Sequence, residues 1–326
     1  MAKYAKISVL NHSNIRFLLP EYDVEGNFDL EKCMQKMAEA LEKNIRCVLP
    51  DKPDLIVLPE TCDRYINLTS EQKKEYYRYR GDRFLDFYRK IAKENNCYIA
   101  YPTVRFVSDD KKTPFRNSTY IIGRDGEIVG IYDKNFLVLR EREEVGTAFG
   151  TEAPVFDLDF GRVCCLICFD LNYIELMHRY AEQKPDLLIF SSAFHGSFVQ
   201  KQWAYNCRSY FVGAVIADNS RIISPVGETV STTCNYQGYT TCKVNMDYAM
   251  MHLDFNNTKI KKAKEKYGEL LQVHNPGHLG SVMLTYEGTD KTIMDIVKEF
   301  DLELLDDYFN RCREIRKKYI MEDKDK

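Results

Sequence analysis

Leu55-Ile-Val-Leu-Pro-Glu60 is an apolar run of strand length that ends in a carboxylate and follows the turn Lys52-Pro-Asp54. The same turn and an equally apolar run recur as Lys184-Pro-Asp-Leu-Leu-Ile-Phe190. Each run comes after a segment whose apolar residues repeat every three or four positions, which is the period of a helix. Strand-length runs that alternate with helical segments are typical of an α/β fold. The repeat favours two halves built alike, although Pro-Asp is also a common turn into a strand.

The rest of the chain continues this alternation with one interruption. An early helix, with an apolar stripe from Met34 to Ile45, has Asn27 or Asp29 as its candidate cap. Ser70 can cap a second long helix that carries an apolar face from Phe84 to Ile91. A β-hairpin around Gly123-Arg-Asp-Gly126 interrupts the pattern. The expected strands are 4–10, 55–58, 97–101, the hairpin over 119–131, 162–168, 186–192 and 212–217.

No Gly/Ser linker and no low-complexity stretch divides the sequence. We therefore expect one α/β domain over residues 1–265. The remaining residues, 266–326, are interpreted as a C-terminal extension.

Composition excludes several classes of protein. The 326 residues carry 46 Lys and Arg against 49 Asp and Glu, so the net charge of −3 offers no basic excess to nucleic acid or anionic lipid. The longest apolar runs fall short of the ~20 residues that a membrane helix needs. No secretory signal is visible at the start, and eleven scattered cysteines are typical of reduced thiols. We expect a cytoplasmic protein that binds neither nucleic acid nor membrane.

Cofactor motifs are missing from the sequence. Neither Gly-x-Gly-x-x-Gly nor Gly-x-x-x-x-Gly-Lys-Ser/Thr occurs. Cys165 and Cys168 form a Cys-x-x-Cys pair, but they lie on an expected strand, where residues three apart point to opposite faces. We therefore expect no metal site and no cofactor.

Three reactive side chains stand at the ends of expected strands. Glu60 ends the run from Leu55, Lys134 ends the hairpin strand Ile131-Tyr-Asp-Lys134, and Cys168 ends the apolar run from Cys164. In open α/β sheets, sites assemble at the carboxyl ends of strands because loops and helix N-termini converge there. Each residue alone has an ordinary explanation, since a cysteine in an apolar strand usually belongs to the core. Their joint occurrence indicates a reactive site.

These strings resemble the nitrilase superfamily of carbon-nitrogen hydrolases over about residues 3–250. The matching motifs are Leu58-Pro-Glu60, Tyr132-Asp-Lys134, the stretch Val155-Phe-Asp-Leu-Asp-Phe-Gly-Arg162 before Cys168, and Asn219-Ser-Arg-Ile-Ile-Ser-Pro-Val-Gly227. The resemblance implies a catalytic triad of Glu60, Lys134 and Cys168. It also implies a second glutamate seven residues before Gly150, which is Glu143, with neighbouring Glu144 as an alternative.

The resemblance further implies a four-layer α-β-β-α sandwich with two central mixed β-sheets, and association into a homodimer or a higher homo-oligomer. The expected helix from Gln202 to Tyr210 carries Trp203 and two tyrosines, followed by Phe211. This is more aromatic surface than one short helix readily hides, which favours a partner subunit. The alternative is that Trp203 turns inward and the tyrosines face water.

The implied activity is hydrolysis of a non-peptide C–N bond through an acyl-thioester on Cys168. Glu60 would act as the base, Lys134 and the N–H of Phe169 would stabilise the oxyanion, and Glu143 would keep Lys134 charged. Cys168-Phe-Asp170 differs from the Cys-Trp-Glu of nitrile hydrolysers, so a small-molecule amide or N-carbamoyl substrate is expected, with release of ammonia or an amine. The aromatic and imidazole candidates for substrate binding are Phe169, Tyr173, Phe194 and His195.

Three alternatives stay open. The chain could be a nitrile-hydrolysing nitrilase, or a non-catalytic relative that serves as a binding scaffold. Cys168 could also pair with His195 in a papain-like arrangement, although this would leave Glu60 and Lys134 without a role.

Overall fold

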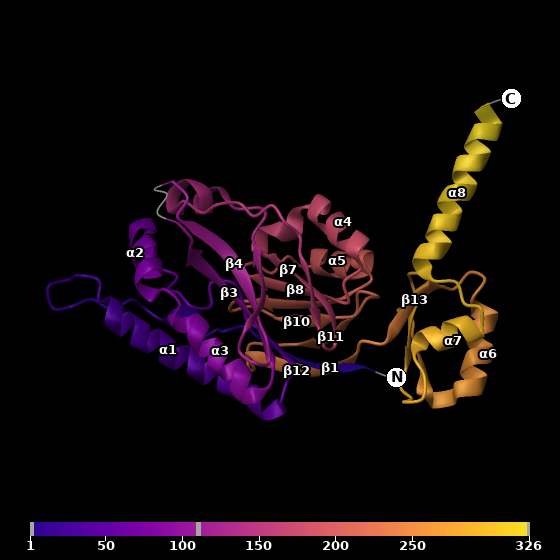
Figure 1. Ribbon diagram of the computed structural model, residues 1–326, viewed down its shortest axis with the longest axis horizontal. Coiled ribbons are helices and arrows are strands. Elements are labelled where there is room, and N and C mark those ends of the chain that lie inside the picture. Colours follow the sequence, from indigo (N-terminus) through magenta and orange to yellow (C-terminus); the bar gives the residue numbers. More distant parts are fainter. Residues whose placement is uncertain (1–2, 109–111, 325–326) are drawn as a thin grey trace. The chain divides into compact units, whose positions relative to one another are not determined.

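Two six-stranded β-sheets, each mixed in strand direction, form the centre of residues Ala5–Val244 (Figure 1). The computed structural model describes residues 3–108 and 112–324. The strand order of the first sheet is β12 (Tyr239–Asn245), β1 (Tyr4–Leu10), β2 (Leu55–Val57), β3 (Tyr98–Phe106), β4 (Phe115–Ile122), β5 (Ile128–Asp133). Strands β1, β2 and β3 are parallel, β4 is antiparallel to β3, and β5 is antiparallel to β4.

The second sheet has the same parallel centre. Its strand order is β11 (Thr229–Thr232), β10 (Arg221–Ile223), β9 (Tyr210–Val215), β8 (Leu187–Ser192), β7 (Gly161–Ile167), β6 (Val155–Leu158). Strands β7, β8 and β9 run parallel, β6 is antiparallel to β7, β10 is antiparallel to β9, and β11 is antiparallel to β10. The hydroxyl of Ser191 in this sheet donates to the carbonyl of Leu58, just after β2 of the first sheet, at 2.8 Å.

Helices cover the outer face of each sheet. Figure 1 shows α1 (Leu30–Arg46), α2 (Ser70–Arg80) and α3 (Arg83–Asn95) on one side, and α4 (Ile174–Gln183) and α5 (Val199–Cys207) on the other. Buried side chains of α1 to α3 form one core cluster with the first sheet, and those of α4 and α5 form another with the second. The expected four-layer α-β-β-α sandwich is therefore confirmed.

Local sequence accounts for the helix boundaries. The carboxylate of Asp29 accepts from the Lys32 N–H at 3.0 Å and caps α1. Where one long helix from Ser70 was expected, the structure has two, because Gly81 adopts φ = 51° and ends α2. The cap of α2 is Thr69, which forms a capping box with Gln72.

A smaller unit comprises the described residues of Met1–Tyr4 and Asn245–Lys326. Its antiparallel sheet has the order β13 (Tyr248–His252), β15 (Ser281–Tyr286), β14 (Leu271–His274), and its helices are α6 (Asn257–Tyr267), α7 (Ile293–Glu299) and α8 (Leu305–Lys324). Residues 245–265 belong to this unit and not to the larger one, unlike the expected boundary at 265. The reason is that β13 pairs with β15, and Ile260 and Ala263 of α6 are buried in the same cluster.

Trp203 turns inward, contrary to the argument that favoured a dimer. It is 2% exposed, and its indole N–H donates to the Leu171 carbonyl at 2.9 Å. Tyr210 and Phe211 are buried as well. These aromatic side chains are therefore covered by their own subunit, and the homodimer remains a prediction without this support.

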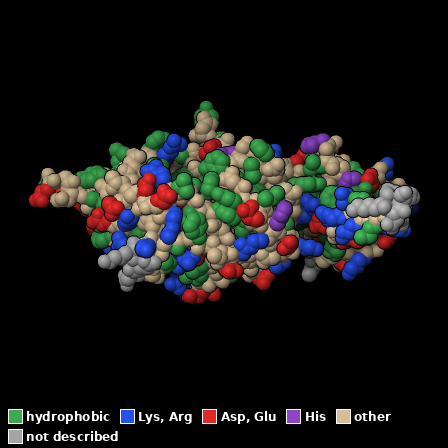
Figure 2. Space-filling view, turned by 90° about the horizontal axis from the view of Figure 1, so that it is seen from above, with side chains coloured by type: hydrophobic (Ala, Val, Ile, Leu, Met, Phe, Trp, Pro, Cys, Tyr) green, Lys and Arg blue, Asp and Glu red, His purple; other side chains and the backbone are tan. Residues whose placement is uncertain are grey.

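Two surface properties can be stated for the described residues. None of their helices combines the length and the apolar character that a membrane crossing requires. On the face drawn in Figure 2, acidic and basic side chains are interspersed, in keeping with the net charge of −3.

Candidate functional site

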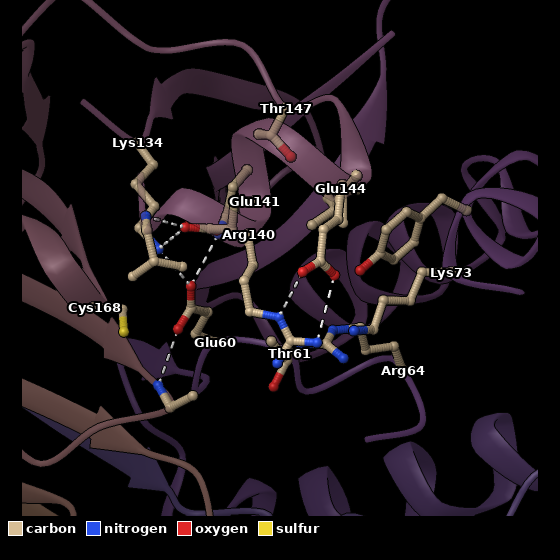
Figure 3. A pocket seen from close by; sticks show the side chains of 16 residues that line it. Glu60, Thr61, Arg64, Lys73, Lys134, Arg140, Glu141, Glu144, Thr147 and Cys168 are labelled. Carbon is tan, nitrogen blue, oxygen red and sulfur yellow. Dashed lines mark hydrogen bonds and ion pairs between the residues drawn. The ribbon is translucent and has the colours of Figure 1, made fainter. Parts of the chain in front are cut away.

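Glu60, Lys134 and Cys168 meet at one cavity of about 230 Å³ (Figure 3). Glu60 follows β2 and Lys134 follows β5 in the first sheet, whereas Cys168 follows β7 in the second. The three side chains thus come from the carboxyl ends of strands in different sheets, and the structure brings together the three residues that the sequence singled out.

Lys134 is a fully buried cation held by two carboxylates. Its ammonium nitrogen lies 3.1 Å from Oε1 of Glu60 and 2.8 Å from Oε2 of Glu141, and its side chain is 1% exposed. Burial alone would lower the pKa of Lys134, but the charges of Glu60 and Glu141 outweigh burial and raise it. The lysine is therefore charged at neutral pH.

Glu60 is ionised for the matching reason. Burial would raise its pKa, but the charge of Lys134 and the hydrogen bonds from Asn117 and Lys134 bring it below the usual value. Its second oxygen, Oε2, accepts from the Ala193 N–H at 3.0 Å. The carboxylate is thus held between the two sheets. Its Oε1 contacts residues of the first sheet, and its Oε2 contacts the chain after β8 of the second.

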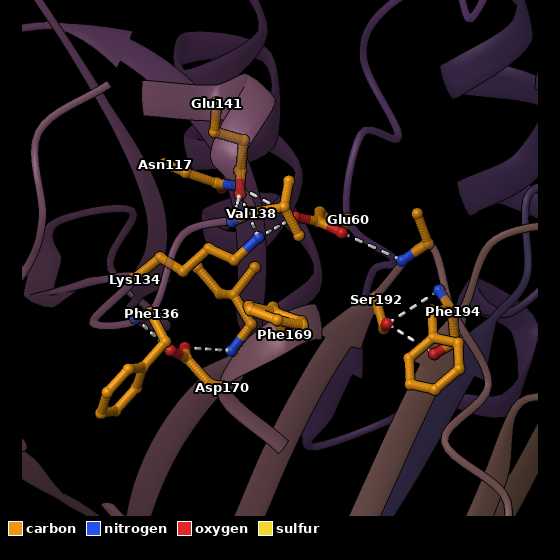
Figure 4. A network of polar contacts seen from close by, with 12 residues as sticks. Glu60, Asn117, Lys134, Phe136, Val138, Glu141, Phe169, Asp170, Ser192 and Phe194 are labelled. Carbon is orange, nitrogen blue, oxygen red and sulfur yellow. Dashed lines mark hydrogen bonds and ion pairs between the residues drawn. The ribbon is translucent and has the colours of Figure 1, made fainter. Parts of the chain in front are cut away.

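Asn117 orients both carboxylates, and sequence reasoning missed it. Its amide nitrogen donates to Oε1 of Glu60 at 2.9 Å and to Oε1 of Glu141 at 2.7 Å (Figure 4). Its carbonyl accepts from the Lys134 N–H at 2.8 Å. A polar residue inside a hairpin strand carries no distinctive local motif, so only the pairing of β4 with the chain after β5 reveals this role.

Cys168 has an unusual backbone and a protonated thiol. It begins the short 3₁₀ turn Cys168–Asn172 with φ = 47°, a left-handed conformation that is rare for residues other than glycine and is concentrated at functional sites. Burial, with the nearby charge of Glu60, raises its pKa to about 12. A neutral thiol beside an ionised carboxylate allows proton transfer to Glu60 as the sulfur attacks an electrophile.

Asp170 ties the turn that carries Cys168 to the segment that carries Lys134. Its carboxylate accepts from the Ile167 N–H at 2.9 Å, from the Phe136 N–H at 2.8 Å and from the Tyr132 hydroxyl at 2.7 Å. Asp170 is fully buried, and burial raises its pKa to about 6. Its three donors fix the distance between the two sheets at the site.

The glutamate that contacts Lys134 is Glu141, and Glu143 is corrected on this point. Glu143 is exposed, and Glu144 binds Ser70 and Arg140. Residues Glu141–Val145 form a π-helical turn, which holds more residues per turn than an α-helix. Glu143 lies seven residues before Gly150, whereas Glu141, which contacts Lys134, lies nine residues before it.

The predicted substrate-binding residues lie beside the cavity but do not belong to its lining in the described part of the chain. The Tyr173 ring stacks on the Phe136 ring with 3.6 Å between the ring centroids. It meets the Phe169 ring edge-on with 5.4 Å between the centroids. Phe194 is half exposed, and Nδ1 of His195 accepts from the Ser197 N–H at 3.0 Å. A role for Phe169, Tyr173, Phe194 and His195 in substrate binding stays a prediction.

Within the described residues, no group of three or more His, Cys, Asp or Glu side chains is arranged to hold a metal ion. Cys165, the other member of the Cys-x-x-Cys pair, is fully buried. Burial raises the pKa of its thiol above the usual range.

Comparison with known proteins shows the family of the chain. The sequence profile of the carbon-nitrogen hydrolase family matches residues 19–252. A deaminated glutathione amidase from Dictyostelium discoideum is 26% identical over 193 residues, which are 55% of this chain and 62% of that protein, so the chain spans less than two thirds of this relative.

Two solved structures share the fold. Nit3 of Saccharomyces cerevisiae, a member of the nitrilase superfamily, matches with a TM-score of 0.60 and 17% identity over 78% of this chain and 94% of its own. A mutant amidase from Nesterenkonia sp. AN1 matches with a TM-score of 0.59 and 13% identity over 75% of this chain and 91% of its own. In that mutant, a glutamine replaces a glutamate, and the acetamide moiety of fluoroacetamide is added covalently at the active-site cysteine. This chain belongs to the carbon-nitrogen hydrolase family, within the nitrilase superfamily.

Proposed function

We propose that the chain hydrolyses the C–N bond of a small amide or N-carbamoyl substrate through an acyl-thioester on Cys168. The observation that carries this proposal is the buried ion pair of Glu60 and Lys134 beside the protonated thiol of Cys168. A thiol with a pKa of about 12 is a poor nucleophile alone, so the carboxylate beside it has a role as base.

In the acylation step Glu60 takes the Cys168 thiol proton while the sulfur adds to the substrate carbonyl carbon. The negative charge that develops on the carbonyl oxygen is stabilised by Lys134 and by the N–H of Phe169, the residue directly after the nucleophile. The C–N bond then breaks, and the leaving nitrogen takes the proton from Glu60. Ammonia or an amine departs, and the acyl group stays on sulfur.

Deacylation repeats these steps with water as the nucleophile in place of the thiol. Glu60 takes a proton from water, the hydroxide adds to the thioester carbon, and Lys134 again faces the oxyanion. The C–S bond breaks, and the sulfur recovers its proton from Glu60. Because Glu141 and Asn117 hold Lys134 and Glu60 in place through both steps, little reorganisation is needed.

Amidase chemistry is favoured over nitrile hydrolysis by the Cys168-Phe-Asp170 turn. It also matches the names of two similar proteins, the Dictyostelium and Nesterenkonia amidases. The experiment is an ammonia-release screen of the purified full chain over primary amides, N-carbamoyl amino acids and nitriles. We expect release from amide or N-carbamoyl compounds. Release from nitriles alone would make the chain a nitrilase, and no release from any class would favour the scaffold alternative.

A further inference from the structure

The chain turns sharply directly after the proposed base. Thr61, which lines the cavity next to Glu60 (Figure 3), has φ = 60°. This left-handed conformation is an outlier for a β-branched residue, because the branched side chain crowds the backbone there. Among the described non-glycine residues with positive φ, Thr61 is the only β-branched one. Residues in such conformations persist only where the surrounding structure fixes them.

The turn is anchored two residues further on. The carboxylate of Asp63 is buried, and it accepts from the Arg80 guanidinium at 2.7 Å and from the Thr103 hydroxyl at 2.6 Å. The Tyr101 hydroxyl donates to the same carboxylate. These three donors come from α2 and β3, so their contacts tie the turn to the elements that surround it.

The backbone of Asp63 and the guanidinium of Arg80 have further partners. The Asp63 carbonyl accepts from the Tyr76 hydroxyl at 2.8 Å, and Arg80 also donates to the Val104 carbonyl. The side chains of both members of the ion pair are buried. Removal of one partner from a buried ion pair leaves the other charge uncompensated, which is strongly unfavourable. The turn therefore has one well-defined position relative to α2 and β3.

The chain before Glu60 is fixed as well, by contacts with both sheets. The Leu58 N–H donates to the Ala100 carbonyl of β3 at 3.2 Å, and the Leu58 carbonyl accepts from the Ser191 hydroxyl of β8 at 2.8 Å. The ring of Pro59 fixes the φ angle of the next residue. Glu60 thus follows a segment that has little freedom to move.

The soft point between these two anchors is Thr61. Rotation of Thr61 to a negative φ would redirect the chain, so that Glu60 and Asp63 could not both keep their places. The Glu60 carboxylate lies 3.1 Å from the Lys134 ammonium, and it shares the cavity with Cys168. A shift of about 1 Å in a catalytic group is enough to cost about a hundredfold in rate.

We propose that Asp63 is a positioning residue for Glu60. The buried donors around Asp63 hold Thr61 in its left-handed conformation, and this conformation keeps the Glu60 carboxylate beside the Cys168 thiol. Asp63 does not belong to the cavity lining in the described part of the chain, so it acts through the backbone and not on the substrate. The inference rests on the proposed function, in which Glu60 is the base.

The first test removes one donor to Asp63 and keeps the ion pair. Tyr101→Phe should lower kcat for an amide substrate about five- to tenfold and change KM less than about twofold, because the base shifts while the rest of the cavity stays in place. Tyr88→Phe is the matched control. Tyr88 is buried with 4.7 Å between its ring centroid and that of Tyr101, and its hydroxyl has no hydrogen-bond partner among the described residues. Equal effects of the two substitutions on kcat would contradict the proposal.

The second test asks whether the backbone of Thr61 carries the effect. Asp63→Asn should lower kcat about a hundredfold, and Thr61→Gly in the same protein should restore at least about tenfold, because glycine adopts φ = 60° without a steric cost. Lys52→Gly is the control, since Lys52 has a similar φ of 50° in the turn before β2. Lack of restoration by Thr61→Gly, or equal restoration by Lys52→Gly, would overturn the proposal. If Asp63→Asn does not fold, Thr103→Val keeps the ion pair and carries the same comparison.

A further measurement separates this inference from the proposed function. Alkylation of Cys168 by iodoacetamide at pH 7, followed by mass spectrometry of its peptide, depends on proton removal by Glu60 and needs no amide turnover. Asp63→Asn should slow this alkylation about tenfold in the wild-type protein but less than about twofold in a Glu60→Gln protein, since residues that act through one another are not additive. Equal slowing in both backgrounds would mean a purely structural role and would refute the positioning of Glu60. The non-additive result supports it even if no amide is hydrolysed.

Discussion

The two halves of the large unit, one around each sheet, are built on the same plan. Where a strand end of the first half corresponds to a strand end of the second, only one of the two carries a reactive group. Ile7, Leu55 and Tyr98 lie side by side in the first sheet as Val163, Leu187 and Tyr210 do in the second. Lys52 and Lys184 both turn into their strands with φ near 50°. The carboxylates of the two following aspartates, Asp54 and Asp186, accept from the N–H of Lys6 and of Arg162 on the neighbouring strand.

The difference lies just beyond the strands. His12 follows β1 with φ = 46° and Cys168 follows β7 with φ = 47°, so they occupy equivalent positions. His12 is 2% exposed, and burial lowers its pKa to about 3, so its ring is neutral. Cys168 opens instead onto the cavity that Glu60 and Lys134 share. Likewise Glu60 of the first half corresponds to Ser192 of the second.

This comparison shows how one site arises from a repeated scaffold. The first half supplies the carboxylate and the cation, and the second half supplies the thiol. The hairpin β4–β5, whose counterpart in the second sheet is β10–β11, places Asn117 and Lys134 against Glu60.

The largest effect should come from Cys168→Ala, which removes the nucleophile. We expect kcat to fall by more than about a thousandfold, since a nucleophile and its base act as a unit. Cys165→Ala, in the same strand, should retain activity within about tenfold because its buried thiol does not line the cavity. Steady-state ammonia release measures both variants. Activity of Cys168→Ala close to that of the wild type would remove the cysteine mechanism.

Glu60→Gln should rank next, because it keeps the shape of the side chain and removes the base. A loss of about 10²–10⁴ in kcat is expected. Ser192→Ala at the equivalent position of the other half should lose no more than about tenfold, since the Ser192 hydroxyl bonds the backbone of Phe194 and, as a neutral neighbour of the Cys168 thiol, cannot serve as its base. If the serine variant were the more damaged of the two, the assignment of the base to Glu60 would be wrong.

Glu141 and Glu143 share the π-helical turn, and substitutions at the two positions should differ in their effect on kcat by a smaller factor. Glu141→Gln removes one of the two charges that hold Lys134, and we expect kcat to fall about ten- to a hundredfold. Glu143→Gln should leave kcat within about twofold, because the Glu143 side chain is exposed. The reverse order would restore Glu143 as the second glutamate.

Much of this site could be predicted from sequence, and the failures have physical causes. Glu60, Lys134 and Cys168 were found because each ends a strand, and strand ends of parallel sheets converge. Glu141 lies two residues from the position that the spacing to Gly150 gives, so only its contact with Lys134 in the folded chain identifies it. Asn117 lies inside strand β4 and approaches Glu60 and Glu141 only in the folded chain. The break at Gly81 and the pairing of β13 with β15 likewise depend on tertiary structure.

The smallest effect concerns the pH dependence of stability. Burial raises the pKa of Asp170 from 3.8 to about 6, so the folded protein binds this proton more tightly than the unfolded chain. The resulting stabilisation is present below pH 4 and is lost as the pH rises through 6. The free energy of unfolding of the wild type relative to Asp170→Asn should therefore decrease by up to roughly 3 kcal/mol between pH 4 and pH 7. Urea titrations at several pH values measure it, and parallel curves for the two proteins would contradict the shift.

The most direct test of the account is the mass of the protein during turnover. Glu60→Gln should acylate slowly and deacylate more slowly still, because the water lacks its base. After incubation with an amide substrate and acid quenching, mass spectrometry should show one acyl group, located on the peptide that contains Cys168 and absent from Cys168→Ala. An acyl group on a different residue, or ammonia release by Cys168→Ala at the wild-type rate, would contradict a thioester on Cys168.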